Sequence, residues 1–258
     1  LANVRDEQAQ VLVRRDGSDE DLVLKVALDV AHNERLVAEG EVLARLHHQH
    51  IVAHRETLSV AGRTALLLRN AGEKTLAALL RHEGRLSLDL LQRFGRELIE
   101  AVNHLESEGV AHRDIKPENI GVSATRTGKL QLVLFDFSLC RTPLTNLTAG
   151  TQPYLDPFLS LRRPPRWDLY AERFALAVTL YEVAVGQQPV WGDGRTSPAM
   201  LEVEATSERE VFDPVMRDGL GAFFTRALRR DPRERHDNAE EMLRAWDAIF
   251  TARATLHP

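Results

Sequence analysis

The sequence of 258 residues has a single cysteine, Cys140, and no long apolar segment. One cysteine cannot close an internal disulfide, which excludes the small disulfide-stapled folds of secreted proteins. No stretch reaches the ~18 consecutive apolar residues that a membrane helix needs. The first residues include Arg5, Asp6 and Glu7 and lack the apolar core of a signal peptide. We therefore expect a cytoplasmic domain with no membrane partner and, because the chain begins with Leu1 rather than methionine, a piece of a longer protein.

Lysine is also scarce in this chain. Only four of the 33 basic residues are lysines, at positions 25, 74, 116 and 129. Ammonium and guanidinium groups are not interchangeable at a tight site, so each of these lysines is a candidate for a specific role. The net charge of −5 provides no overall basic surface. We therefore expect no direct nucleic-acid binding by this domain.

The order of the sequence patterns predicts two unequal parts. Before residue 70, β-rich runs predict short strands at 11–13, 22–27, 57–60 and 64–68, with one helix over 33–47. After Gly72, apolar residues are mostly spaced three and four apart, which predicts helices over 75–80, 87–109, 170–185, 215–229 and 238–251. Short strands are expected near residue 120 and at 130–135. The pattern indicates a small strand-rich lobe, residues 1–70, followed by a larger helical lobe, residues 71–258.

The densest group of reactive residues is the segment 112–120, which reads HRDIKPENI. It places the carboxylate of Asp114, the ammonium of Lys116 and the carboxamide of Asn119 within six residues, and Pro117 forbids a continuous helix. A loop that holds a base, a cation and an oxygen ligand for a hard metal suits phosphoryl transfer. The segment resembles the catalytic loop of eukaryotic-like (Hanks-type) bacterial serine/threonine protein kinases, H-R-D-x-K-P-x-N. A charged surface loop is the alternative, which so dense a match disfavours.

A second carboxylate follows a hydrophobic strand seventeen residues after Asn119. The segment Leu-Phe-Asp-Phe-Ser ends at Ser138 and resembles the family's D-F-G motif, with Asp136 as its aspartate. The resemblance implies that Asn119 and Asp136 hold Mg²⁺ between the phosphates of ATP, with Mn²⁺ as a substitute. Serine in place of glycine removes backbone freedom and is expected to restrict movement of Phe137.

The lysine in the apolar run 22–26 needs a partner, because an unpaired buried ammonium is costly. Fourteen residues later, Glu39 begins a pattern that resembles the family's third helix. The resemblance implies that Lys25 contacts the α- and β-phosphates of ATP and that Glu39 holds Lys25. Glu41 lies on another face of the expected helix and is rejected. The alternative for Lys25 is an exposed edge-strand lysine.

The segment 150–157, GTQPYLDP, is similar to the G-T-x-x-Y-x-A-P-E signature of the same family. The resemblance implies that Thr151 bonds Asp114 and Lys116 and indicates serine/threonine specificity. Near the C-terminus, 231–235 resembles the family's D-P-x-x-R stretch, so the resemblance runs from about residue 22 to residue 243. It implies a bilobal α+β protein-kinase fold over 1–258, with an antiparallel β-rich N-lobe.

The resemblance also places the adenine-binding segment and candidate regulatory sites. Leu68 is the expected gatekeeper, and the hinge covers Arg69, Asn70 and Ala71. Three threonines in the segment after Asp136 are candidate phosphorylation sites, with unmodified loop residues as the alternative: Thr142, Thr145 and Thr148. Arg113 is placed to pair with a phosphothreonine there.

The family's glycine-rich phosphate loop is absent from residues 1–10. Without glycine, backbone amides approach the phosphates less closely, and Asp6 and Glu7 would repel them. Three interpretations stay open: the sequence starts too late, the segment is a different lid, or ATP binding is impaired.

Three structural supports of the family also differ in this chain. Phe158 stands where a glutamate normally pairs with Arg235, so this ion pair is expected to be missing. Glu172 replaces the aspartate that braces the catalytic loop, which puts that geometry in doubt. Gly121 falls where a bulky apolar residue normally floors the adenine pocket.

These residues predict a serine/threonine protein kinase that transfers the γ-phosphoryl group of Mg-ATP to protein hydroxyls, as a domain of a larger signalling or defence protein. Asp114, Lys116, Lys25, Glu39 and Thr151 are its candidate catalytic residues. One alternative is a pseudokinase that acts as a binding or allosteric module. A small-molecule kinase of the aminoglycoside type is disfavoured, because that class lacks a counterpart of Lys116 and of the 150–157 signature. A zinc site in the histidine-rich segment 47–50 is disfavoured, because no further ligand has suitable spacing.

Overall fold

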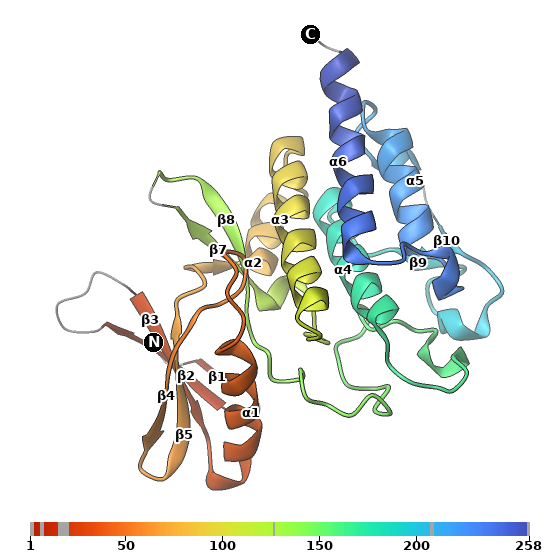
Figure 1. Cartoon of the computed structure of the whole chain (residues 1–258). Coiled ribbons are helices and arrows are strands. Elements are labelled where there is room, and N and C mark those ends of the chain that lie inside the picture. The colour runs from red at the N-terminus through yellow and green to blue at the C-terminus, as the bar shows by residue number, and fades with distance from the viewer. Residues whose placement is uncertain (1–2, 6–7, 15–20, 126, 207–208, 257–258) are drawn as a thin grey trace.

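The computed structural model describes residues 3–5, 8–14, 21–125, 127–206 and 209–256. Its first part is an antiparallel sheet covered by one helix, α1 (Asn33–Leu43) (Figure 1). The sheet has the order β1-β2-β3-β5-β4. Its strands are β1 (Asn3–Arg5), β2 (Gln8–Arg14), β3 (Asp21–Ala27), β4 (His54–Val60) and β5 (Arg63–Arg69). The register places Lys25 of β3 opposite Gln10 of β2 and Leu66 of β5, in the middle of the sheet.

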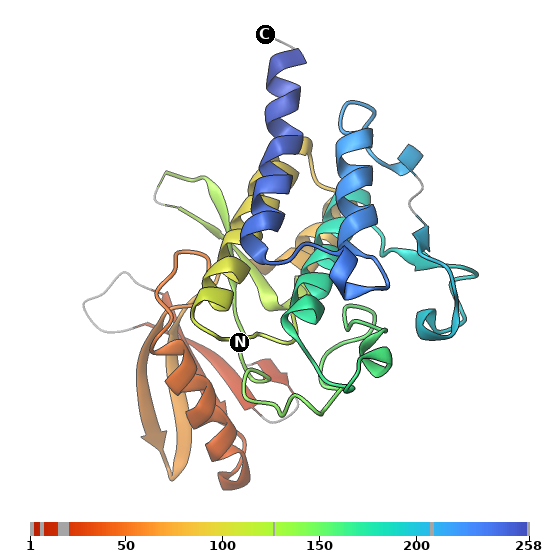
Figure 2. The ribbon, with the colours of Figure 1, turned by 45° about the vertical axis from the view of Figure 1, so that its right-hand side comes forward.

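The second part is mainly helical. Its helices are α2 (Leu76–Glu83), α3 (Leu88–Ser107), α4 (Leu169–Val185), α5 (Arg217–Ala227) and α6 (Ala239–Leu256). A three-stranded sheet of β6 (Lys74–Thr75), β7 (Ile120–Ala124) and β8 (Leu130–Leu134) lies beside α3, and β9 (Val190–Trp191) pairs with β10 (Ala205–Thr206). Figure 2 shows α3, α4 and α6 running side by side. Short 3₁₀ turns occupy 30–32, 117–119, 159–161, 198–200, 209–211 and 232–234.

Helix α4 is the centre of the second part. It is apolar around most of its circumference, as is typical of a helix enclosed by other elements. Asp168 caps its N-terminus by accepting a hydrogen bond from the backbone of Ala171, and Gly186 ends it in the left-handed conformation. A polar side chain on such a helix is held in a fixed position, which matters for Glu172.

The structure confirms the bilobal α+β fold and the predicted helices and main strands. The helix predicted over 33–47 ends earlier, at Leu43, because the chain turns into the segment that leads to Ile51. Short strands β1, β6, β9 and β10 were not predicted, because two or three residues carry no readable alternation and depend on their partner strands. Among the described residues, no helix combines the length and apolarity needed to cross a membrane.

Candidate active site

The three ionisable groups Lys25, Glu39 and Asp136 meet although they come from β3, α1 and the segment after β8. Lys25 Nζ lies 2.7 Å from both carboxylate oxygens of Glu39 and 2.9 Å from Asp136 Oδ1. Burial alone would lower the pKa of the Lys25 ammonium, but the two carboxylates outweigh it and raise that pKa. Burial likewise acts to raise the pKa of the Asp136 carboxyl, and Lys25 reverses this and lowers it. Lys25 and Asp136 are therefore charged at neutral pH, whereas burial raises the pKa of the Glu39 carboxyl even though Lys25 acts to lower it.

The residues around Asp136 hold its carboxylate toward Lys25. The backbone N–H of Phe137 donates to Glu39 Oε1 at 3.1 Å, and the Phe137 ring is buried edge-on against His112, with 4.6 Å between ring centroids. Arg35 Nε of α1 donates to the carbonyl oxygen of Ser138 at 3.1 Å. The Ser138 side chain also acts to lower the pKa of the Asp136 carboxyl, an effect that glycine could not have.

The residues of the predicted catalytic loop, Asp114, Lys116 and Asn119, form a hydrogen-bonded network with Thr151. Thr151 Oγ1 donates to Asp114 Oδ1 at 2.7 Å, and Lys116 Nζ donates to Thr151 Oγ1 at 2.5 Å. Lys116 Nζ is also 2.7 Å from Asp114 Oδ2. Asn119 Nδ2 donates to Asp114 Oδ2 at 2.9 Å. Thr151, Lys116 and Asn119 all contact the Asp114 carboxylate, so the side chain of Asp114 is held in one orientation.

Glu172 on α4 binds the backbone of this loop. Its carboxylate accepts hydrogen bonds from the backbone N–H groups of His112, at 2.6 Å, and Arg113, at 3.0 Å. Complete burial raises the pKa of Glu172 to about 7, although the two backbone donors act to lower it. The longer glutamate therefore reaches the backbone of the loop, and the doubt raised by this substitution is removed.

The predicted loss of the Arg235 ion pair is wrong. Arg235 Nη1 lies 2.6 Å from Asp156 Oδ2, and both side chains are buried. Asp156 also pairs with Arg162 at 2.7 Å. The partner carboxylate is thus two residues before Phe158, whose ring packs instead among Phe174 and Trp191. Sequence reasoning missed Asp156 because it assigned the partner by motif position alone.

A cavity of about 180 Å³ opens between the two parts of the chain beside Lys25 and Asp136. The four residues predicted to contact the nucleotide here all line this cavity: Leu68, Arg69, Asn70 and Ala71. Gln10 of β2 also lines it and was not predicted from the sequence. Asp6 and Glu7, which the sequence predicts would repel the phosphates, lie outside the described residues.

Gly121 brings β7 and the hinge into direct contact at the floor of this cavity. A Cβ atom at Gly121 would lie 2.3 Å from the carbonyl oxygen of Ala71, and one at Gly72 would lie 2.2 Å from the carbonyl oxygen of Val122. Neither site can hold a side chain without moving backbone. Gly121 has no side chain to form the floor of the cavity, and the backbone of the hinge forms it instead.

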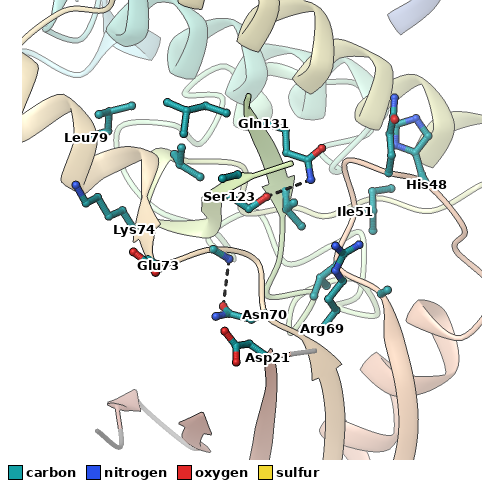
Figure 3. A pocket seen from close by; sticks show the side chains of 18 residues that line it. Asp21, His48, Ile51, Arg69, Asn70, Glu73, Lys74, Leu79, Ser123 and Gln131 are labelled. Carbon is teal, nitrogen blue, oxygen red and sulfur yellow. Dashed lines mark hydrogen bonds between the residues drawn. The ribbon is translucent and has the colours of Figure 1, made fainter. Parts of the chain in front are cut away.

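A second, larger cavity of about 610 Å³ lies on the other side of the hinge (Figure 3). Ile51 and Leu79 contribute apolar walls, and Ser123 and Gln131, 3.1 Å apart between hydroxyl and amide nitrogen, lie across it. Asn70 accepts a hydrogen bond from Gly72 N at 3.1 Å where the two cavities share a wall. The larger cavity includes none of the catalytic-loop residues.

Two oxygen donors suit a hard cation. The carboxylate of Asp136 and the carboxamide oxygen of Asn119 lie on segments joined by a 3.0 Å hydrogen bond from Phe135 N to Asn119 O. Magnesium is commonly bound by one or two such protein groups plus substrate phosphates and waters. This donor set therefore fits Mg²⁺.

Among the described residues, no cluster of three or more His, Cys, Asp or Glu side chains is arranged to hold a metal. In the histidine-rich segment, His48 stacks on His104 and His50 Nδ1 lies 3.0 Å from the carbonyl oxygen of Leu132.

The candidate phosphorylation sites lie in the segment that joins Asp136 to Thr151. Thr145 and Thr148 are exposed and Thr142 is half-buried. Arg113, expected to pair with a phosphothreonine, contacts backbone carbonyls of this segment instead.

The fold and this group of residues define a protein kinase. The protein kinase domain family model matches residues 12–246, and the chain belongs to that family. It is 42% identical over 254 residues to the probable kinase PglW of Streptomyces coelicolor, covering 88% of this chain and 16% of that protein. It is 27% identical over 247 residues to the serine/threonine-protein kinase PknB of Mycobacterium leprae, covering 90% of this chain and 38% of PknB. It is 29% identical over 249 residues to CBL-interacting protein kinase 29 of rice, covering 93% of this chain and 52% of that protein. The chain thus spans only part of the length of each relative.

Proposed function

We propose that this domain is a serine/threonine protein kinase that transfers the γ-phosphoryl group of Mg-ATP to hydroxyl groups of proteins. The observation that carries the proposal is the hydrogen-bonded network of Asp114, Lys116, Thr151 and Asn119. The ion pairs of Lys25 with Glu39 and Asp136 support it, because a protein kinase needs both its lysine–glutamate pair and its metal-binding aspartate in place.

In the proposed reaction the hydroxyl oxygen of the substrate bonds to the γ-phosphorus while the bond to the β–γ bridging oxygen breaks and ADP leaves. Asp114 orients the hydroxyl and accepts its proton. Lys116, 2.7 Å from Asp114, offsets negative charge on the transferred group. Thr151 bonds both Asp114 and Lys116 and so fixes their positions relative to each other. It borders the position that the substrate hydroxyl would take.

The nucleotide would lie in the cavity beside the hinge. Its base would contact Leu68 and the backbone of residues 69–71, and Lys25 would bind the α- and β-phosphates while Glu39 holds it. Asn119 and Asp136 would hold Mg²⁺, which when bound neutralises charge on the phosphates and polarises the transferred group. Gln10 on β2 lines the same cavity and would lie over the nucleotide.

The test is phosphate transfer by the purified protein and its Asp114→Asn variant. With Mg-ATP, we expect phosphate on the wild-type protein or on an added protein substrate, by intact mass and by radiolabel. We expect a fall of at least ~100-fold in Asp114→Asn, because general-base catalysis contributes about 10²–10⁴. The matched control is Asp247→Asn, an exposed carboxylate on α6, which should retain the wild-type rate. Equal transfer by Asp114→Asn would contradict the mechanism, and transfer to aminoglycosides but to no protein would contradict the substrate class.

A further inference from the structure

The activation segment, residues 136–157, is held at its middle by Arg113. The Arg113 guanidinium donates to the carbonyl oxygen of Thr142, to that of Pro143 at 3.1 Å and to that of Asn146 at 2.9 Å. All three acceptors are backbone atoms. The contacts therefore depend on the path of the segment and not on the identity of its side chains.

Aromatic packing adds to the environment of the guanidinium, whose Nε is buried without a hydrogen-bond partner. Its central carbon lies 4.9 Å from the ring centre of Trp167, over the face of the ring. The backbone N–H of Trp167 donates to the carbonyl oxygen of Leu144 at 2.8 Å. Trp167 therefore contacts both Arg113 and the segment that Arg113 holds. Both Arg113 and Trp167 are buried.

The position of Arg113 is itself fixed from the catalytic loop. Its backbone has a positive φ of 71°, and its N–H donates to Glu172. The next residue is Asp114, so one short stretch of backbone carries both the catalytic carboxylate and the arginine that holds the segment. The segment in turn supplies Asp136 at its start and Thr151 near its end.

The threonines of the segment are not the groups that order it. Thr142 contributes only its carbonyl oxygen to Arg113. The Thr148 hydroxyl donates to Asn146 Oδ1 at 3.1 Å, and Thr145 is exposed. A phosphate on any of them is therefore not required to give Arg113 its partners.

We propose that Arg113 is a positioning residue that keeps the activation segment in its catalytic arrangement through backbone carbonyls. Transfer by this domain then does not depend on phosphorylation of Thr142, Thr145 or Thr148. The proposal rests on the proposed kinase function for its rate prediction, but its structural part, order of the segment without phosphate, is testable whether or not transfer occurs.

The first test compares the unphosphorylated and phosphorylated protein. Protein treated with phosphatase and shown by intact mass to carry no phosphate should protect the backbone amides of residues 139–150 from hydrogen exchange as strongly as phosphorylated protein. Its transfer to an added protein such as casein should start without a lag. Protection or rate that rises tenfold or more with phosphate on these threonines would overturn the proposal. Absence of transfer in every state, with the segment protected, would refute the kinase function and leave the ordering by Arg113 standing.

The second test uses variants of both partners. The triple variant Thr142→Ala, Thr145→Ala, Thr148→Ala keeps all the carbonyl acceptors and should transfer phosphate within twofold of wild type. Arg113→Lys keeps the charge but loses the planar fork, and should increase exchange in 139–150 at least tenfold.

Kinetics separate positioning from general damage to the fold. In Arg113→Lys the kcat should fall at least tenfold and the KM for the protein substrate should rise, while the KM for ATP stays within twofold, because no residue of the hinge contacts Arg113. The matched control is Arg93→Lys, an arginine that lies over the ring of Phe94 on α3 and should change none of these values. A tenfold loss in the triple variant, or wild-type exchange and kinetics in Arg113→Lys, would overturn the proposal.

Discussion

Replacement of Asp156 by alanine tests the corrected ion pair directly. The variant leaves the guanidinium of Arg235 buried without its carboxylate, in a site where both side chains have almost no exposed surface, 1% and 0%. Removing one partner of a buried pair costs about 3–5 kcal/mol. Arg235 keeps hydrogen bonds to the carbonyl oxygens of Arg229, at 2.6 Å, and Tyr170, at 3.3 Å. We therefore expect the lower end of this range.

A loss of about 3 kcal/mol lowers the melting temperature of a domain of this size by about 6–12 °C. Urea unfolding followed by circular dichroism gives the free energy, and calorimetry gives the temperature. The control is Asp247→Ala, whose pairing with Arg96 is exposed and should be worth less than about 1 kcal/mol.

The double variant Asp156→Ala, Arg235→Met separates an unpaired buried charge from lost packing. Once Arg235 is also replaced, no charge is left without a partner, because Arg162, the other partner of Asp156, keeps Asp168 at 2.9 Å. The double variant should therefore be more stable than Asp156→Ala alone by about 1–2 kcal/mol. A destabilisation below about 1 kcal/mol in Asp156→Ala, or a double variant less stable than the single one, would refute the assignment.

Two further predictions concern the hinge and the catalytic loop. Gly121→Ala should weaken nucleotide binding at least tenfold by calorimetric titration, because its Cβ would lie 2.3 Å from the carbonyl oxygen of Ala71; Ser123→Ala on the same strand should bind normally, and equal affinities would contradict the steric argument. The kcat should fall with an apparent pKa of about 7 as pH decreases, because protonation of Glu172 removes an acceptor for the catalytic-loop backbone. Because folding raises this pKa, Glu172 contributes stability that is fully present below its ordinary pKa and is lost as the pH rises through about 7. Glu172→Gln should therefore remove both the fall in kcat at low pH and this pH dependence of stability. If kcat still falls at low pH in that variant, another group is responsible.

The candidate catalytic residues could be predicted from the sequence because the chemistry proposed for them depends on short, dense motifs. Asp114, Lys116 and Asn119 lie within six residues, and the buried lysine required a carboxylate partner that the helical pattern supplied in Glu39. Their meeting with Asp136 also followed, because the family resemblance fixed the order of the elements.

What the sequence did not indicate are contacts that replace a familiar residue by one at a different position. Asp156 reaches Arg235 from two residues before the expected site, and nothing in local spacing distinguishes the two. The floor of the 180 Å³ cavity beside the hinge is closed by the backbone of Ala71, which a side-chain pattern cannot reveal. Arg113 likewise bonds carbonyl groups, and every residue carries one.

The buried pair of Asp156 and Arg235 also fixes the far end of the activation segment, as Lys25 and Glu39 fix the near end. The activation segment is thus anchored in both lobes, and Arg113 binds it between the two anchors. Loop entropy changes only slowly with length, so insertions near residues 148–149, beyond the carbonyl groups that Arg113 and Trp167 bind, should cost little in folding. A single residue inserted beside either end, or between residues 142 and 146, would displace Asp136, Thr151 or the acceptors of Arg113. Natural variation in the length of this segment should therefore be confined to the few residues between Asn146 and Gly150.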